Sequence, residues 1–301
     1  MQDRGHLLTE RRNRRSEQLD TLSVAEAFDV MNAEDASIAS AVARARRDIC
    51  AAVELVVAAF KSGGRLIYVG AGTSGRLGVL DASECPPTFL SDPTMVQGII
   101  AGGDDALRRS IEGAEDVPED GAAAMDAREV GPDDVVFGIA TGGTTPYVHG
   151  ALDRARQLGA KTVFFGCVDR DQVGDTADVS IRVLVGPEVV TGSTRLKAGT
   201  ATKMVLNQVS TLAMVQTGKV FGNLMVDVNT QANAKLVERG RRIIETVTGL
   251  EREQAGQLLD RAAGRVKIAL VMHARKVTAS QADRLLAEHV GHLGRILDDA
   301  L

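Results

Sequence analysis

The sequence predicts an α/β protein, built on a parallel sheet with helices on both faces. Two observations predict this class. Short apolar runs alternate with helical stretches along most of the chain, and two of those runs lead straight into loops of glycine, serine and threonine. With 44% hydrophobic residues in 301 positions, the chain can bury a full α/β core and still carry a smaller appendage.

Five strands are expected, each a short apolar run bounded by turn residues. They fall at residues 66–69, 95–101, 134–140, 162–166 and 179–185. Helices are expected around them, at residues 38–61, 105–114, 119–128, 146–158 and 198–217. Nearer the N-terminus, Ser23 and Glu26 have the spacing of a capping box, which predicts another helix starting there.

The character of the chain changes after Thr248 and Gly249. Short helices are expected at residues 251–263, 266–273 and 278–286, without strands. The sequence therefore predicts a sheet domain over residues 1–248, with an N-terminal helical arm, and a helical module over residues 249–301. At about 50 residues, that module is expected to be too small for a deep pocket of its own.

Composition excludes several classes of protein. The net charge of −5, with no basic stripe, argues against nucleic acid as a partner. No run has the length of a membrane span, and the arginines at residues 11–15 lack the apolar stretch of an export signal. Cys50, Cys85 and Cys167 lack metal-ligand spacing, which favours buried thiols in a reducing cytoplasm. Cys85 stays open as a nucleophile, although no histidine is near it in sequence.

The loop at residues 70–75, after the first strand, has the composition of an anion site. Its glycines, Gly72 and Gly75 among them, let the backbone approach a ligand, and the helix that follows offers free N–H groups. The hydroxyls of Thr73 and Ser74 can donate to phosphate oxygens. These four residues are therefore candidate phosphate ligands.

The same loop also reads as G-x-G-x-x-G, the dinucleotide fingerprint. That motif expects an acidic residue about 20 positions on, whereas the first candidate here, Asp104, comes late. Pro86 and Pro87 are expected to break the crossover helix, and Glu84 just before them puts a carboxylate near the bound group. From this loop alone, a nucleotide, another phosphate and a plain tight turn all stay open.

A second loop, Thr141-Gly142-Gly143-Thr144-Thr145, follows the strand at residues 134–140 and leads to a proline that suits the first turn of a helix. Ligands of doubly wound sheets sit beyond the carboxyl ends of the strands. The two loops therefore predict one phosphate held between them, or a phosphate at one loop and sugar hydroxyls at the other.

The segment GPEVVTGSTRLKAGT, at residues 186–200, resembles the signature shared by N-acetylmuramic acid 6-phosphate etherases and the glucokinase regulatory protein. Both are built on the sugar isomerase (SIS) fold. Thr9, Glu10 and Asn13 also look like the etherase, as do three longer motifs. These are GAGTSGRLGVLDASECPP at 70–87, EGAED at 112–116 and GKVFGNLMVDV at 218–228. The resemblance covers nearly the whole chain.

The resemblance implies a three-layer αβα sandwich with a five-stranded parallel sheet, plus the helical module. It also implies a homodimer with sites near the interface, no metal or nucleotide cofactor, and cleavage of the lactyl ether of a sugar phosphate. By motif position, Glu84 resembles the group that protonates the lactyl oxygen, and Glu115 the group that acts at C2. Residues alone do not separate Glu115 from Glu112, expected on the same helical face.

Arg195 and Lys197 are candidates to offset the charge of the substrate, with a structural salt bridge as the alternative. One departure from the family concerns the second loop, which usually reads like ASGRT. Here Gly142 stands in place of the serine and Thr144 in place of the arginine, so Thr141 is the candidate substitute. A sugar-phosphate-binding regulator and an aldose–ketose isomerase remain alternatives, although Glu84 and Glu115 together favour the etherase.

Overall fold

The structure is a computed structural model that describes residues 5–230 and 234–297. It divides into two compact units. One comprises Met1–Ser83 and Thr94–Ser210, and the other comprises Glu84–Pro93 and Thr211–Leu301. The helices α4 (Gly72–Phe89) and α8 (Lys197–Gln216) each begin in the first unit and end in the second.

The first unit contains a five-stranded sheet in the order β2-β1-β3-β4-β5, in which every pairing is parallel. The strands are β1 Leu66–Gly70, β2 Val96–Ile100, β3 Val135–Ile139, β4 Lys161–Gly166 and β5 Val179–Arg182. This confirms the predicted fold class. Because the chain steps outward from β1 to β2 and then returns to β3, the switch point of the sheet lies between β1 and β3.

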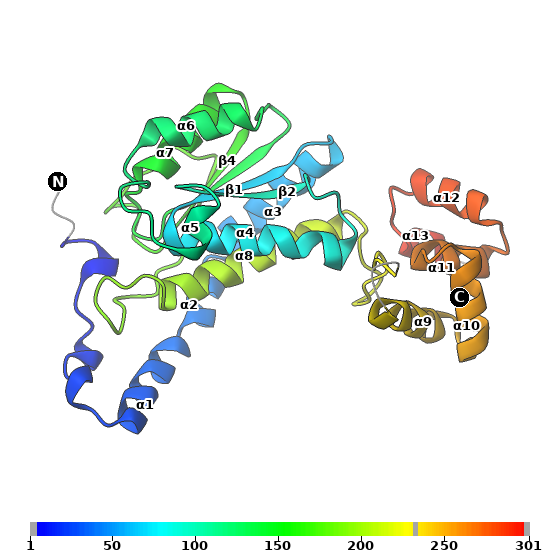
Figure 1. Ribbon diagram of the computed structural model, residues 1–301, viewed down its shortest axis with the longest axis horizontal. Coiled ribbons are helices and arrows are strands. Elements are labelled where there is room, and N and C mark those ends of the chain that lie inside the picture. The colour runs from blue at the N-terminus through cyan, green and yellow to red at the C-terminus, as the bar shows by residue number, and fades with distance from the viewer. Residues whose placement is uncertain (1–4, 231–233, 298–301) are drawn as a thin grey trace. The chain divides into compact units, whose positions relative to one another are not determined.

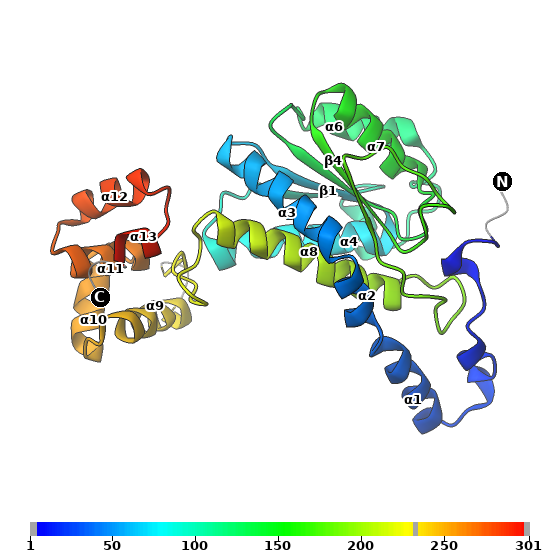
Figure 2. The ribbon, with the colours of Figure 1, turned by 180° about the vertical axis from the view of Figure 1, so that it is seen from behind.

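Helices cover both faces of this sheet (Figures 1 and 2). One face carries α6 (Pro118–Ala127) and α7 (Pro146–Gln157). The other carries α3 (Arg46–Lys61), α4 and α8. On the α7 face, Ile67, Val136 and Phe164 pack with Val148 and Leu152 in one buried cluster. Burial of such side chains stabilises each by roughly 1.5–3 kcal/mol, which holds the layers together.

The N-terminal arm of the first unit consists of three short 3-10 turns, Leu8–Glu10, Arg14–Ser16 and Leu19–Thr21, followed by α1 (Val24–Asp35) and α2 (Ile38–Arg44). The capping box predicted at Ser23 is present, because the Ser23 amide donates to Glu26 Oε2 at 2.8 Å and the Glu26 amide donates back. Within α1, all of which is described, Glu34 is the buried residue. This helix projects from the sheet (Figure 1).

Three expected helices differ in the structure. The segment at 38–61 is split at Ala45, and the segment at 105–114 is helical only over α5 (Asp105–Arg108). The break expected at Pro86 and Pro87 was wrong, since α4 continues to Phe89. Both prolines lie in its last turn, where each lacks the N–H group that would close a helical hydrogen bond to the turn before.

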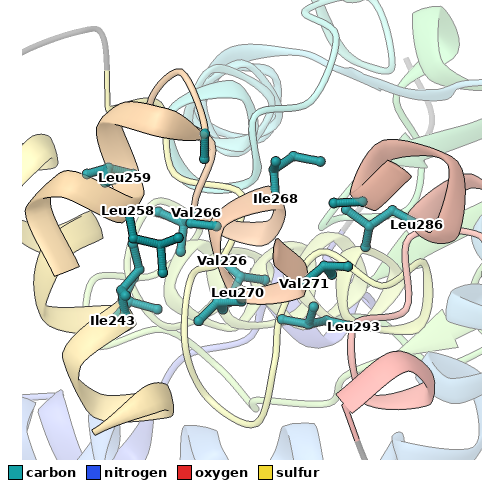
Figure 3. Close-up of a cluster of buried hydrophobic side chains, with 14 of the residues drawn as sticks. Val226, Ile243, Leu258, Leu259, Val266, Ile268, Leu270, Val271, Leu286 and Leu293 are labelled. Atoms are coloured by element: carbon teal, nitrogen blue, oxygen red, sulfur yellow. The ribbon is translucent and has the colours of Figure 1, made fainter. Parts of the chain in front are cut away.

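The second unit contains α9 (Ala234–Thr248), α10 (Arg252–Arg261), α11 (Val266–Arg275), α12 (Ala279–Glu288) and α13 (Gly294–Leu297). They enclose a cluster of buried side chains in which Ile243 of α9 lies with Leu258 and Leu270 (Figure 3). The helix α9 was not expected. Because its apolar residues share this cluster, the helical unit extends before the predicted boundary at residue 249. None of the helices in the described ranges is long and apolar enough for a bilayer crossing.

Candidate active site

The first loop joins β1 to α4 at the switch point of the sheet. Its tightness has a packing cause, because a Cβ built at Gly70 would lie 2.7 Å from the amide nitrogen of Gly75. One built at Gly75 would lie 2.6 Å from Cγ1 of Ile100. The helix begins at Gly72, so the amides of its first turn point away from the helix without intrahelical acceptors. Thr73 and Ser74 belong to this turn, which has the donors and the dipole of an anion site.

A pocket of about 260 Å³ opens beside this turn. One wall is the first loop with Arg76, and the others come from residues 101–106 and 109–116. Its lining residues are Ala71, Gly72, Arg76, Ala101, Ala106, Arg109, Ser110, Ile111, Glu112, Gly113, Ala114, Glu115 and Asp116. The structure thus brings Glu115 and Gly72, which are 43 positions apart, to one pocket.

Glu115 lies in a turn rather than on a helix, so the expectation that Glu112 and Glu115 share a helical face was wrong. Gly113 between them has φ +78°, a left-handed conformation that ends helical geometry. The carbonyl of Glu115 accepts the amide of Tyr147 at 3.0 Å, and this bond ties the turn to α7. Glu112 instead accepts the hydroxyl of Ser110 at 2.7 Å. The two carboxylates therefore differ in what positions them.

Arg76 is a pocket residue that sequence reasoning missed. Its guanidinium donates to the carbonyls of Leu107 and Arg109, both at 3.1 Å, and this holds the far wall of the pocket against α4. Arg109 also lines the pocket and pairs with Asp105 at 2.7 Å. The spacing along the sequence could have indicated this residue. Arg76 follows Gly72 by four positions and therefore lies on the same face of α4.

The second loop lies at the end of β3, next to the first loop at the end of β1, because β1 and β3 are paired in parallel. Gly143 has φ +84°, and Thr145 is the N-cap residue of α7. Nε2 of His149 lies 2.7 Å from the carbonyl oxygen of Gly143, and the imidazole stacks on Phe164. His149 therefore fixes the shape of this loop.

Within the second loop, Thr141 is buried and its carbonyl accepts the amide of Cys167 at 2.8 Å. Gly142 and Thr144 are partly exposed. Around Gly142 there is space, since the nearest atom to a Cβ built there is Oγ1 of Thr9, at 3.8 Å. That hydroxyl is buried and has no hydrogen-bond partner among the described residues.

The third segment is a structural junction. Glu188 is fully buried, and its carboxylate accepts the amides of Lys197 and Ala198, both at 2.9 Å, at the start of α8. Burial raises the pKa of the Glu188 carboxyl, and the two amide donors oppose that rise. The Lys197 ammonium is 2% exposed and lies 2.5 Å from Glu34 Oε2. Lys197 is thus held in an ion pair with α1, while Arg195 is exposed.

Asn13 joins the arm to this junction. Its amide nitrogen donates to Glu34 Oε2 at 2.9 Å and to the carbonyl of Pro187 at 3.2 Å. Ser16 Oγ donates to the carbonyl of Val189 at 2.8 Å. The N-terminal arm is therefore hydrogen-bonded to the third segment.

Glu84 is exposed on α4, three turns after Gly72, and belongs to the second compact unit. It is not among the residues that line the first-loop pocket. The pocket groups Glu115 with the first loop, and the sheet places the second loop beside the first.

Comparison with known proteins first identifies the class. Residues 48–156 match the glucokinase regulatory protein N-terminal SIS domain, and residues 111–212 match the SIS domain. A Bacteroides fragilis structure, described as a candidate phosphosugar isomerase involved in capsule formation, has a TM-score of 0.50 and 18% identity to this chain. The match covers 71% of this chain and 97% of the Bacteroides fragilis chain, which shows that the two proteins share a fold. The chain is a SIS-domain protein.

Curated relatives then identify the family. The chain is 56% identical to the N-acetylmuramic acid 6-phosphate etherase of Crocosphaera subtropica, over 97% of this chain and 96% of that protein. It is 54% identical to the same-named protein of Gloeothece citriformis, over 100% of this chain and 98% of the relative. The chain belongs to the N-acetylmuramic acid 6-phosphate etherase family.

Proposed function

We propose that this protein cleaves the D-lactyl ether of N-acetylmuramic acid 6-phosphate, giving N-acetylglucosamine 6-phosphate and D-lactate. Near full-length relatives that carry the etherase name support this activity. The structural observation that carries it is the pocket that joins Glu115 to the first turn of α4. Such a site offers N–H donors for a phosphate and a carboxylate for proton transfer in the same place.

The chemistry needs two proton-transfer groups because an ether oxygen is a poor leaving group. In the open-chain sugar, the C1 aldehyde acidifies the proton on C2, and the lactyl oxygen on C3 is in the β position. Glu115 removes the C2 proton, and Glu84 protonates the departing lactyl oxygen. Water then adds at C3 of the unsaturated aldehyde with Glu84 as base, while C2 takes up a proton from Glu115 or from solvent. General acid–base groups of this kind contribute typically about 10²–10⁴-fold each.

Phosphate binding is assigned to the two strand-end loops. Gly72, Thr73 and Ser74 supply amides from the first turn of α4, and Thr73 and Ser74 also supply hydroxyls. Gly75 keeps the turn tight, because its amide donates to the Ala71 carbonyl at 3.2 Å. At the second loop, Gly142 offers a backbone amide, and Thr144 and Thr145 offer hydroxyls. The amide of Gly143 donates to the Ala140 carbonyl at 2.8 Å, so Gly143 shapes the loop instead. Arg195 is the exposed cation of the third segment and is assigned to the charge of the substrate, whereas Lys197 acts through its ion pair with Glu34.

A homodimer completes the site in this proposal. A proton-shuttling carboxyl needs burial or a neighbouring negative charge, yet Glu84 and Glu115 are both exposed in the single chain. The projecting helix α1 also leaves Val24 90% exposed, Phe28 64% and Met31 38%, at positions that share one helical face. A second copy that covers this face would bury apolar surface. Cys85 and Cys167 are both buried, which fits a reducing cytoplasm as the compartment.

The test is incubation with N-acetylmuramic acid 6-phosphate and measurement of free D-lactate. An isomerase would leave the lactyl group attached, and a regulator would bind the sugar without turnover, so a well-folded sample that releases no lactate would remove the etherase proposal. Light scattering in parallel tests the dimer, which an active monomer at micromolar concentration would contradict.

Isotopes test the route. Turnover in heavy water should place deuterium at C2 of the product sugar, because the proton removed there is replaced from solvent. Water labelled with oxygen-18 should label the C3 hydroxyl of the sugar and leave lactate unlabelled, because the bond broken joins C3 to oxygen. Label in lactate, without deuterium at C2, would end the elimination route even if both glutamates proved essential.

A further inference from the structure

The second compact unit contains a cavity of about 450 Å³, although the helical module was expected to be too small for a deep pocket. Residues 226–230, the start of α11, two residues of α12 and Leu90 line it. The cavity is possible because the unit extends beyond residues 249–301 and includes the segment before α9. Its volume lies within the range of about 300–1,000 Å³ that is typical of small-molecule sites.

Most of the wall is apolar. Val226, Val266, Ile268 and Leu286 all belong to the buried cluster of this unit, and Figure 3 shows them drawn from three separate segments of the chain. Leu90 also lines the cavity, yet it is 47% exposed. An apolar wall that remains open to solvent favours a ligand with an apolar body.

One cation, Lys267, is buried in this wall. Its residue is 8% exposed, and its ammonium donates to Asp227 Oδ2 at 2.7 Å. An ammonium carries three N–H donors, and Asp227 is the hydrogen-bond partner found for it in the part of the chain that the structure describes. The other two donors have no protein acceptor among the described residues.

The charge around Lys267 is not balanced. Lys219 also approaches Asp227 Oδ2, at 3.7 Å, so that two ammonium groups share one carboxylate. The other charged residues that line the cavity, Arg265 and Asp283, pair with each other at 3.0 Å. Burial lowers the pKa of Lys267, Asp227 opposes this effect, and Lys219 adds to it. An anion beside Lys267 would offset the remaining positive charge.

We propose that this cavity binds a small amphipathic anion, a carboxylate or a phosphate monoester with an apolar body. The anionic group accepts the two available N–H donors of Lys267. The apolar part packs on Val226, Ile268 and Leu90. Such a ligand differs in kind from a sugar phosphate, because its body is apolar and packs on the hydrophobic part of the wall.

Titration calorimetry on the full chain tests this site with octanoate, hexyl phosphate and neutral octanol. Both anions should bind, and octanol should bind at least about tenfold more weakly, because it lacks the charge-assisted hydrogen bonds. Octanoate and hexyl phosphate also separate the two ligand chemistries. Equal affinity for octanol and octanoate would overturn the assigned role of Lys267, and no binding of either anion would overturn the site.

Lys267→Met should weaken binding of the preferred anion by about tenfold or more, because methionine keeps the apolar stem without the donors. The matched control is Lys235→Met, at an exposed lysine of α9, which should leave the affinity unchanged. Anion binding that survives Lys267→Met undiminished belongs to another site, and would contradict the proposal.

A second variant covers the case in which Lys267→Met fails to fold. Leu90→Glu replaces an exposed side chain that lines the cavity, so it should fold normally and repel an anion at the mouth. Octanoate and hexyl phosphate should both bind Leu90→Glu more weakly than the unmodified protein. If the folded variant binds both anions with unchanged affinity, the proposal is contradicted, whatever the result for Lys267→Met.

Discussion

The two strand-end loops share a position in the fold but differ in what shapes them. In the first loop, close contact between β1 and α4 fixes the backbone, because a Cβ at Gly70 or Gly75 would collide with main-chain or core atoms, whereas Gly72 has open space and a φ of +52°. In the second loop, Gly142 has open space around it, and the contact of His149 with the Gly143 carbonyl holds the turn.

The difference is one between positions, because a Cβ at Gly143 in the second loop would also lie close to the core, 2.8 Å from Cγ2 of Val168. Gly70 and Gly75 are tied to the packing of the sheet, and α4 begins at a turn that carries the hydroxyls of Thr73 and Ser74. Gly142 is not constrained by packing in this way. We therefore expect stability to be more sensitive to a substitution at Gly75 than to one at Gly142.

The largest expected effect is the loss of turnover when either proposed catalytic carboxylate is replaced. Glu115→Gln, in the first-loop pocket, and Glu84→Gln should each fold normally and lose turnover by roughly 100-fold or more, since each removes a proton-transfer group. Initial rates of D-lactate release measure this loss.

Glu112→Gln is the matched control for Glu115, because Glu112 lines the same pocket but is bound to Ser110. It should change the rate only mildly. If Glu112 proves sensitive and Glu115 does not, the motif assignment is displaced by three residues.

A smaller effect compares the glycines of the two loops. Gly75→Ala places a Cβ 2.7 Å from the carbonyl oxygen of Gly70 and should lower the free energy of unfolding by about 1–3 kcal/mol. Gly142→Ala meets only Thr9 Oγ1, at 3.8 Å, and should leave stability unchanged or raise it by up to about 1 kcal/mol. Urea denaturation measures both. Equal losses of unfolding free energy at the two positions would remove the distinction between Gly75 and Gly142.

The smallest expected effect concerns the space around Gly142 in the second loop. Gly142→Ser adds a hydroxyl within reach of Thr9 Oγ1, which is buried without a partner among the described residues. The new hydrogen bond should raise the free energy of unfolding by about 1 kcal/mol. Thr9→Val should be nearly neutral in the unmodified chain and should cancel the gain in the Gly142→Ser background. A double-mutant cycle on unfolding free energies measures this coupling, and additive effects would show that the two hydroxyls do not meet.

The sheet was predictable because its strands are short apolar runs with turn residues at both ends, and β1 to β5 lie within a few residues of their expected places. The turn that contains Glu115 was not predictable. It depends on the left-handed backbone conformation of Gly113, which the amino-acid composition of the segment does not reveal. Arg76 shapes the pocket by donating to two carbonyl oxygens that lie more than 30 positions away in the sequence. Sequence patterns report local periodicity, whereas these features depend on contacts between distant segments.

A structural salt bridge was one of the two roles expected for Lys197, but its partner Glu34 was unpredictable for the same reason, since 163 positions separate the two residues. The pair also constrains how this family can diverge. Replacing either partner leaves the other charge buried and unpaired, which typically lowers the free energy of unfolding by about 3–5 kcal/mol. That is a large share of the roughly 5–15 kcal/mol by which a domain is stable. Single substitutions at either position are therefore selected against, and the two should change together across relatives: an alignment should show lysine at 197 paired with an acidic residue at 34, or both replaced by apolar residues.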